Sequence, residues 1–445
     1  MVGDNMDYAD QMWAQENLSE ERARLARYQA AWDAYFGNMP EPLKVKPGQA
    51  NDNVRVNYAR LIVDVGVSDL FGKEPKFDLD PNSNEPTPAQ IYLDEVWRLN
   101  RKQILLQKAA TNGAVCGHVF IKIVPRGMNT APRLINLSPE YVSVVTDPDD
   151  IDLVLRYVIE YTARDANGKP ITIRQVIEQQ ENGTWLIVDK VSRNNGQWEI
   201  RQTVQHPYQW PPIIDCQNLP SPNEYYGIAD IEGDVLALNH AYNFTKSNTQ
   251  RIIRFHAHPK TWGRGFTANE LKIGIDDTIV FGNPTAELHN LEMQTDLTSS
   301  IEYAERLKRD LHETSRVPEV ATGKLDSAAG LSGVALQILY QPLTQKTRAK
   351  RLTYGEMLVE LNRRLLEMAG FGGAGLCLIL WGELRPTSAL EERQVLLLDK
   401  QLGVSQDTLL HKAGYDPDME RQKREQETTG VDLADQLLAG FDKGA

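Results

Sequence analysis

One apolar seam constrains the fold of this chain more than any other feature of its sequence. It follows residues 206–222, a proline-rich stretch that predicts a rigid linker. Apolar residues then recur at intervals of three and four, the spacing that packs a long helix against a neighbour. A helix from Ile228 to Phe255 would be about 40 Å long, and we expect its apolar surface to exceed what one subunit covers. The seam consists of Ile228, Ile231, Val235, Leu238 and Tyr242, with Ile252 later in register.

The residues before this seam predict an α+β region with antiparallel strands. The first helix, Leu18–Tyr35, is opened by Ser19 and is expected to turn Arg22 and Arg24 toward water. Further helices are expected at Val56–Phe71, Gln90–Leu99 and Lys102–Asn112. Regular alternation of strands and helices is missing, which argues against a parallel sheet. The expected strands are His118–Val124, Leu134–Leu137, Tyr141–Val145, Leu153–Thr162, Ile171–Ile177, Trp185–Val191 and Gln197–Thr203, with a hairpin turn at Asn182-Gly183.

Beyond the seam the sequence predicts long helices separated by short strands and loops. A helix is expected at Leu297–Ser315, and another from Gly333 to about Ala369, where Pro342 predicts a kink. A loop of small residues, 321–332, separates the two. Short helices are expected from residue 386 onward. The expected strands are Leu271–Ile275, Thr278–Phe281, Ala286–Leu291 and Leu376–Trp381.

Charge is distributed unevenly along the chain. The net charge of −13 over 445 residues argues against a protein that wraps nucleic acid tightly. Two stretches, Val235–Asn269 and Gln337–Gly355, nevertheless contain no Asp or Glu. Their cations either lie on solvated faces paired with acidic neighbours such as Glu302 and Glu305, or contact a polyanion or an acidic partner, which the location on the longest helices favours. These cations are Lys246, Arg251, Arg254, Lys260 and Arg264 in the first run, and Lys346, Arg348, Lys350 and Arg351 in the second.

Short motifs recur in the same order as in the portal proteins of long-tailed bacteriophages, and the sequence resembles that family from Asn57 to Glu420. Ala229 departs from the pattern, since relatives more often have Ser there. The motifs are Asn57–Asp64, Phe71-Gly72-Lys73-Glu74-Pro75, Ala110–Ile123 with Gly113 and Gly117, Leu137-Ser138-Pro139-Glu140, Tyr226–Glu232, Val317-Pro318, Leu331–Leu336 and Gly414-Tyr415-Asp416-Pro417.

The resemblance implies a portal fold with an α/β wing, a long-helix stem, a small α/β clip, a tunnel loop with a kinked helix, and a helical C-terminal crown. It implies a homo-oligomeric ring, usually of twelve subunits, with an axial channel for double-stranded DNA at one capsid vertex. Its domains would be the wing at 1–225, stem helix 1 at 226–255, the clip at 256–296, stem helix 2 at 297–317, the tunnel loop at 318–333, the tunnel helix and return to the wing at 334–385, and the crown at 386–445.

The resemblance also implies partners and a location. The expected partners are the large terminase, a head-completion or adaptor protein, and the major capsid or scaffolding protein. The resemblance implies residence in the virion, at the portal vertex of the capsid. We expect assembly in the host cytoplasm, since the N-terminus has no apolar signal region and no stretch is long enough to span a membrane. Cys116, Cys216 and Cys377 are far apart, which fits reduced thiols. No cofactor is expected.

Three sets of residues are candidate functional residues. Small side chains would let a ring of tunnel loops converge on the axis, where Lys324 and Asp326 nearly cancel in charge. The tunnel-loop residues are Gly323, Lys324, Asp326, Ser327 and Gly330. The channel or clip cations are Lys246, Arg251, Arg254, Lys260, Arg264, Lys346 and Arg348. The assembly seam is Ile231, Val235, Leu238 and Tyr242.

Two other classes of function remain as alternatives. A structural capsid component without a channel role is one. The other is a metal-dependent hydrolase, in which His256 and His258, with His240 or His289, would bind the metal. The chain lacks the eight-fold strand–helix alternation that such a site needs. Gly323-Lys324 is not a phosphate-binding loop because Pro318 and Leu325 occupy its required Gly and Ser/Thr positions. We therefore expect no enzymatic activity.

Overall fold

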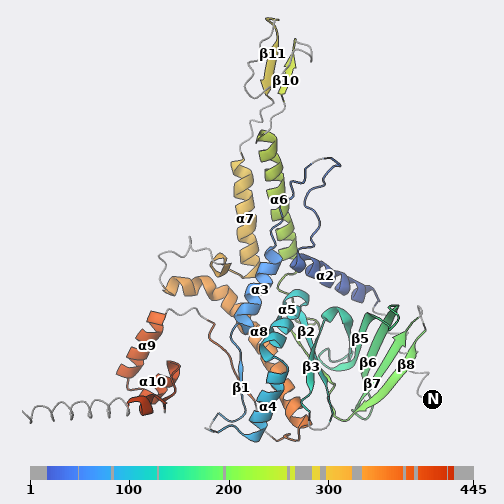
Figure 1. Ribbon diagram of the computed structural model, residues 1–445, viewed down its shortest axis with the longest axis vertical. Helices are drawn as coiled ribbons and strands as arrows, with labels where there is room; N and C mark the ends of the chain where they lie inside the picture. Colours follow the sequence, from blue (N-terminus) through green and yellow to red (C-terminus); the bar gives the residue numbers. More distant parts are fainter. Residues whose placement is uncertain are drawn as a thin grey trace, which may run out of the picture. The chain divides into compact units, whose positions relative to one another are not determined.

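The computed structural model describes residues 18–48, 50–81, 85–127, 130–193, 197–257, 261–265, 283–290, 297–322, 333–373, 377–384, 389–417 and 419–424. Helices and antiparallel strands make up this part of the chain, which confirms the α+β class (Figure 1). The chain divides into two compact units. The first comprises Met1–Ala329 and Leu339–Glu383, and the second comprises Gly330–Ile338 and Leu384–Ala445.

Four helices precede the sheets, at the positions that the sequence predicts to within a few residues. Asn57 caps the second of them by accepting a hydrogen bond from the Arg60 backbone N–H, as N-cap residues do. Gly117 ends the fourth with φ of 82°, a conformation that favours glycine. The helices are α2 (Leu18–Phe36), α3 (Tyr58–Phe71), α4 (Pro88–Leu99) and α5 (Lys102–Cys116).

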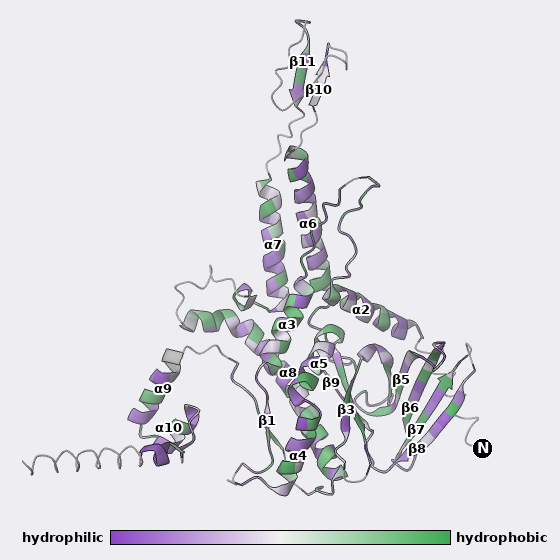
Figure 2. Cartoon of the chain, in the orientation of Figure 1, coloured by the Kyte–Doolittle hydropathy of each residue, from purple (hydrophilic) through white to green (hydrophobic). Residues whose placement is uncertain are grey.

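Two antiparallel sheets follow, and a largely buried carboxylate joins them. Asp215 accepts hydrogen bonds from the hydroxyls of Tyr157, at 2.7 Å, and Tyr225, at 2.5 Å, and lies 2.9 Å from His118 Nε2. Figure 2 shows hydrophobic and hydrophilic residues mixed along the larger sheet, as one buried face requires. One sheet has the order β3-β2-β9 and the other β4-β5-β6-β7-β8. Their bounds are β2 (His118–Val124), β3 (Arg133–Leu137), β4 (Val142–Thr146), β5 (Val154–Arg164), β6 (Pro170–Gln179), β7 (Trp185–Ser192), β8 (Glu199–His206) and β9 (Ile213–Gln217).

The proline-rich stretch 206–222 is not a linker, so that prediction is wrong. It contains strand β9, which pairs with β2 between Ile213↔Lys122 and Gln217↔His118. Trp210 is buried in a hydrophobic core with residues of α4, α5 and α8, and its indole Nε1 donates a hydrogen bond to the Glu367 carboxylate at 2.9 Å. Pro211 and Pro212 stand just before the strand, where missing N–H donors interrupt no pairing.

Arg24 does not face water, contrary to the prediction from the periodicity of its helix. Its guanidinium lies 4.5 Å from the centre of the Tyr226 ring and donates to the backbone carbonyls of Pro139 and Val142. Glu21 accepts from its Nε at 2.8 Å. Its four hydrogen bonds and the aromatic face compensate the guanidinium for the loss of water.

Three long helices complete the first unit and begin the second: α6 (Gly233–Ala257), α7 (Thr298–Ser315) and α8 (Gly333–Met368). Helices α6 and α7 lie side by side, and Tyr242 packs with Ala304 and Leu307 between them (Figure 1). Helix α6 begins five residues later than predicted. Ile228 instead donates a backbone hydrogen bond to the carbonyl of Leu219, just after β9, and Asp230 donates one to the carbonyl of Ala114 in α5.

Short elements account for the remaining described residues. Strand β1 (Lys76–Asp78) pairs with β12 (Leu378–Leu380) in a two-stranded sheet. The sequence predicted β12 but not β1. Strand β10 (Thr261–Arg264), also not predicted, pairs with β11 (Glu287–Asn290). The strands expected at 271–275 and 278–281 lie outside the described residues. Helices α9 (Ala389–Gln401) and α10 (Gln406–Lys412) belong to the second unit, and short 3-10 turns occur at Pro139–Tyr141 and Glu319–Thr322.

The largest core lies between α4, α5 and the second half of α8. Trp97 is completely enclosed, and its Nε1 donates to the buried Asn362 side chain at 2.8 Å. Tyr354 of α8 donates from its hydroxyl to Asn218 at 3.1 Å. Gly113 of α5 lies against that hydroxyl so closely that an added Cβ would be 2.1 Å from it.

We predict that Gly113→Ala lowers the stability of the protein to urea by about 1–3 kcal/mol, because overpacking would displace Tyr354 and break its bond to Asn218. Tryptophan fluorescence during urea unfolding measures the effect. Gly233→Ala is the matched control, since a Cβ there meets nothing within 4 Å. Equal unfolding midpoints for the two variants would contradict the close approach of α5 and α8.

Candidate functional site

A buried carboxylate connects the long helices with the sheet region. Asp230 lies just before α6, and its side chain is fully buried. Lys350 Nζ donates to one carboxylate oxygen at 2.6 Å, and Lys346 Nζ lies 3.3 Å from the other. The Asn218 side chain donates to that second oxygen at 3.1 Å. Two ammonium groups of α8 therefore share a single carboxylate.

The charges around Asp230 decide its protonation. Burial by itself raises the pKa of the Asp230 carboxyl, but the charges of Lys346 and Lys350 and the hydrogen bonds from Lys350 and Asn218 outweigh it. The pKa of Asp230 falls from 3.8 to about 2. Burial also lowers the pKa of Lys350, and the Asp230 charge opposes that shift. The Asp230 side chain is consequently a charged carboxylate at neutral pH.

Further elements meet at the same cluster. Lys346 Nζ donates at 3.0 Å to the backbone carbonyl of Ser315, the last residue of α7. A Cβ on Gly66 of α3 would lie 2.9 Å from Asp230 Oδ2, so that helix also approaches the carboxylate closely. The Asp230 backbone N–H donates to Ala114 in α5 at 2.7 Å. Helices α3, α5, α7 and α8 are thereby held around one charged group.

The second acid-free run divides between the interior and the surface. Lys346, predicted to reach the channel or clip, is buried, and that prediction is wrong because Asp230 and Ser315 bind its ammonium group inside the chain. Lys350 is buried beside it. Arg351 donates to the Gly382 carbonyl at 2.7 Å. Arg348 is exposed, and its role at the channel stays a prediction.

One face of α6 binds an extended segment that precedes α3. Asn239, Asn243 and Ser247 are four residues apart, so they lie on one face of the helix. The Asn243 side chain accepts from the Val56 N–H at 2.9 Å, and the Ser247 hydroxyl accepts from the Val54 N–H at 2.9 Å. Asn239 donates to the Val56 carbonyl at 2.9 Å. Sequence reasoning missed this contact, whose only signal is the four-residue spacing of buried polar side chains.

The same segment supplies a carboxylate for the first acid-free run. Asp52 lies 2.8 Å from the Arg254 guanidinium and 3.7 Å from that of Arg251. These arginines remain 37% and 41% exposed, so each still presents part of its charge to solvent. Part of their charge is thus paired within the same chain, by Asp52 and not by Glu302 or Glu305, and contact with an acidic partner stays a prediction.

The other cations of the first run differ in their surroundings. Lys246 lies over the Tyr242 ring at 5.5 Å from its centre. Arg264 on β10 forms two hydrogen bonds of 2.9 Å with Glu287 on β11. Lys260 lies outside the described residues. Contact of Lys246, Arg251, Arg254 and Arg264 with DNA stays a prediction.

The assembly seam is covered within the subunit, so the expectation of excess exposed apolar surface is wrong. Ile231 and Val235 are buried with residues of α2, α3 and α5. Tyr242 is buried against α7, and Leu238 packs against both clusters. Ile228 lies outside α6. The seam stabilises the subunit itself, and Leu238→Asp would disturb this packing before any contact between subunits.

The proposed tunnel-loop residues, Gly323, Lys324, Asp326, Ser327 and Gly330, lie outside the described residues. Of the suggested metal ligands, His240 is exposed and His289 stacks on Trp262 at 5.1 Å, while His258 and the His256 side chain are not described. Within the described ranges no group of three or more His, Cys, Asp or Glu side chains is arranged to hold a metal. None of the helices in those ranges has the length and hydrophobicity of a membrane span.

Comparison with known families gives a match over most of the chain. The sequence model of the family described as phage portal protein, SPP1 Gp6-like, matches residues 16–430. The chain belongs to this family. The match includes every described element from α2 to α10, and it confirms the family resemblance seen in the short motifs.

A solved structure has a similar fold. A chain in the neck of an empty GTA particle computed with C6 symmetry is 13% identical, with a TM-score of 0.50 over 81% of this chain and 90% of that one. A chain in the virion of a native gene transfer agent particle is 12% identical, with a TM-score of 0.48 over 88% of this chain and 94% of that one. No curated protein matches the sequence.

We predict that Asp230→Asn lowers the free energy of unfolding by about 3–5 kcal/mol, because it leaves two buried ammonium groups without a carboxylate. Since the folded pKa of about 2 lies below the ordinary 3.8, the carboxylate stabilises the fold above about pH 4 and loses this effect as the pH falls toward 2. Urea unfolding between pH 2 and 7 should therefore show a weaker acid dependence in the variant. Asp234→Asn, at an exposed carboxylate of α6, is the control; similar losses in both variants would contradict the role of the cluster.

Proposed function

We propose that this portal-family chain forms a homo-oligomeric ring through which double-stranded DNA enters the capsid during packaging and leaves during ejection. The family match over residues 16–430 carries this proposal. The likeness to a chain from a particle neck supports the fold on which it depends. The ring would be located at one vertex of the virion capsid, and we propose no catalytic function for it.

We assign the elements to the domains that the family resemblance implies. The wing, 1–225, would comprise α2 to α5 with strands β1 to β9, and the stem would comprise α6 and α7. Residues 256–296, with β10 and β11, would form the clip, and 318–333 the tunnel loop. Helix α8 would be the tunnel helix within 334–385, and α9 and α10 would belong to the crown.

The electrostatics of the stem and clip support a conduit that does not hold DNA tightly. Affinity for DNA rises with each phosphate that a cation neutralises. Arg251 and Arg254 share Asp52, and Arg264 has Glu287, so their net attraction for phosphate is reduced. Partly exposed cations with nearby carboxylates guide a polyanion without fixing it, which suits DNA that must slide.

Partners follow from the same assignment. We propose that the large terminase docks at the clip during packaging, that a head-completion or adaptor protein binds there afterwards, and that capsid or scaffolding protein surrounds the wing. The exposed pairing of Trp262 with His289 on the paired strands β10 and β11 gives the clip an aromatic surface suited to such contacts.

We predict that the purified chain forms rings with a central hole in electron micrographs. Exposed apolar residues on α8 and β12, Leu352, Leu378 and Leu380, supply surface for contacts between subunits. Leu380→Asp should reduce the fraction of rings several-fold while leaving the thermal unfolding of the subunit unchanged, because this side chain is half exposed. Sedimentation that detects only monomer of the unaltered chain at micromolar concentration would contradict the ring.

We also predict that bulk in the tunnel loop blocks DNA passage. Gly330→Trp, or deletion of Asp326–Gly330, should reduce packaging into heads by at least about tenfold, since a ring of loops would converge on the axis. Gly373→Trp is the control, because nothing lies within 4 Å of a Cβ at that exposed position. Normal packaging with both loop variants would show that the loop does not line the path.

A further inference from the structure

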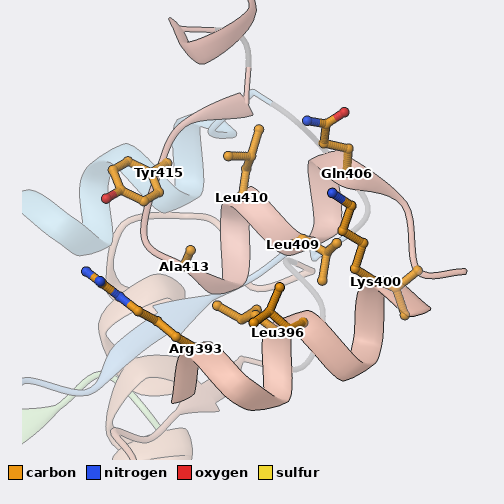
Figure 3. A pocket seen from close by; sticks show the side chains of 10 residues that line it. Arg393, Leu396, Lys400, Gln406, Leu409, Leu410, Ala413 and Tyr415 are labelled. Carbon is orange, nitrogen blue, oxygen red and sulfur yellow. The ribbon is translucent and has the colours of Figure 1, made fainter. Parts of the chain in front are cut away.

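Helices α9 and α10 enclose an apolar groove that nothing described in the chain fills. Its volume is about 490 Å³. Leu396 and Leu397 of α9 line it together with Leu409, Leu410 and Tyr415. Figure 3 shows Leu396 of α9 and Leu409 of α10 facing each other between the two helices. Lys412 of α10 lies 3.0 Å from Asp399 of α9, an ion pair that links the two helices.

Two such short helices do not bury enough apolar surface by themselves. Among the described residues of 389–424, no hydrophobic side chain is buried, and Leu397 is 61% exposed. Helices of thirteen and seven residues depend on packing for their stability. A third apolar element in the groove would supply the missing core.

The sequence immediately after these helices has a matching pattern. Val431, Ala434, Leu438 and Phe441 are spaced three, four and three, the period of one helix face, with Leu437 beside it. Residues 425–430 separate this segment from Arg424, and six residues reach at most about 20 Å when extended. A segment on so short a tether has a millimolar effective concentration at the groove.

Charge is complementary between the groove and the segment. Arg393 and Lys400 line the groove and are seven residues apart, which places them about 10 Å apart along α9. Asp435 and Asp442 are also seven residues apart. Each follows a seam residue by one position, the location from which charges pair across a helix–helix contact.

We infer that residues 431–442 bind as an amphipathic helix in the groove between α9 and α10 of the same chain. Val431, Leu438 and Phe441 cover Leu396, Leu397 and Leu409, and the two aspartates pair with Arg393 and Lys400. The result is a three-helix unit whose core includes the segment. This inference does not depend on the DNA-channel function.

Cross-linking of the full-length chain tests the contact. Cysteines replace Leu397 in the groove and Leu438 in the segment, and a short bismaleimide joins those that lie close. We expect an internal cross-link, migrating at the mass of one chain and identified by peptide mass spectrometry, at least about tenfold faster than in the control. The matched control is Leu398→Cys with Leu438→Cys, because Leu398 is 57% exposed and does not line the groove. Each single-cysteine variant corrects for the native thiols.

Charge reversal provides a second readout. Arg393→Glu with Lys400→Glu should slow the cross-link at least several-fold, and adding Asp435→Lys with Asp442→Lys should restore it. Equal rates for the Leu397 and Leu398 pairs, no internal cross-link, or a product at twice the mass of the chain would each overturn the inference. The last result would instead assign the groove to a second copy. A quadruple variant slower than the double variant would exclude the proposed charge pairing.

Discussion

The contact of Asp230 with Lys346 and Lys350 is the interaction on which the arrangement of the long helices depends. It draws together residues that are 120 positions apart and buries two cations with one anion. Such a cluster adds little net stability relative to an apolar core, because desolvation offsets most of the attraction. It is intolerant of misplacement, however, since a shift of α8 would leave an ammonium group buried and unpaired. The position of α3 is restricted in the same way, because a Cβ on its Gly66 would lie too close to the Asp230 carboxylate.

Internal pairing also explains why α6 has no carboxylate beyond Asp234. Its arginines take theirs from Asp52, on the segment that Asn239, Asn243 and Ser247 bind along the helix. An Asp or Glu on α6 beside Arg254 would compete with Asp52 and repel it. The arginines of this run therefore stabilise the folded subunit through Asp52. Any contact with DNA uses the part of the arginines that pairing leaves exposed.

Periodicity and turn residues predicted most of the fold, because α2 to α5 and β2 to β8 are determined by their own sequences. The predictions were wrong where contacts with residues far away in the sequence determine the local structure. Arg24 is buried because Tyr226 and two carbonyls receive it, and β9 forms because β2 offers an edge. The candidate site was predicted as a set of cations, without their partners. Lys346 and Lys350, four residues apart on a helix face that also carries Leu343 and Tyr354, had a signal for burial that charge counting overlooked.

The Asp230 cluster also divides α8 at a definite point. Pro342 lacks the N–H that would bond to residue 338, so the helix is weakest just there. After it, Leu343 is 2% exposed and Lys346 and Lys350 are bound to Asp230, whereas before it Ile338 is 64% exposed. Burial of the helix therefore differs on the two sides of Pro342. A bend at Pro342 would leave the anchored part of the helix in place, because Lys346 and Lys350 hold it through Asp230 and Ser315.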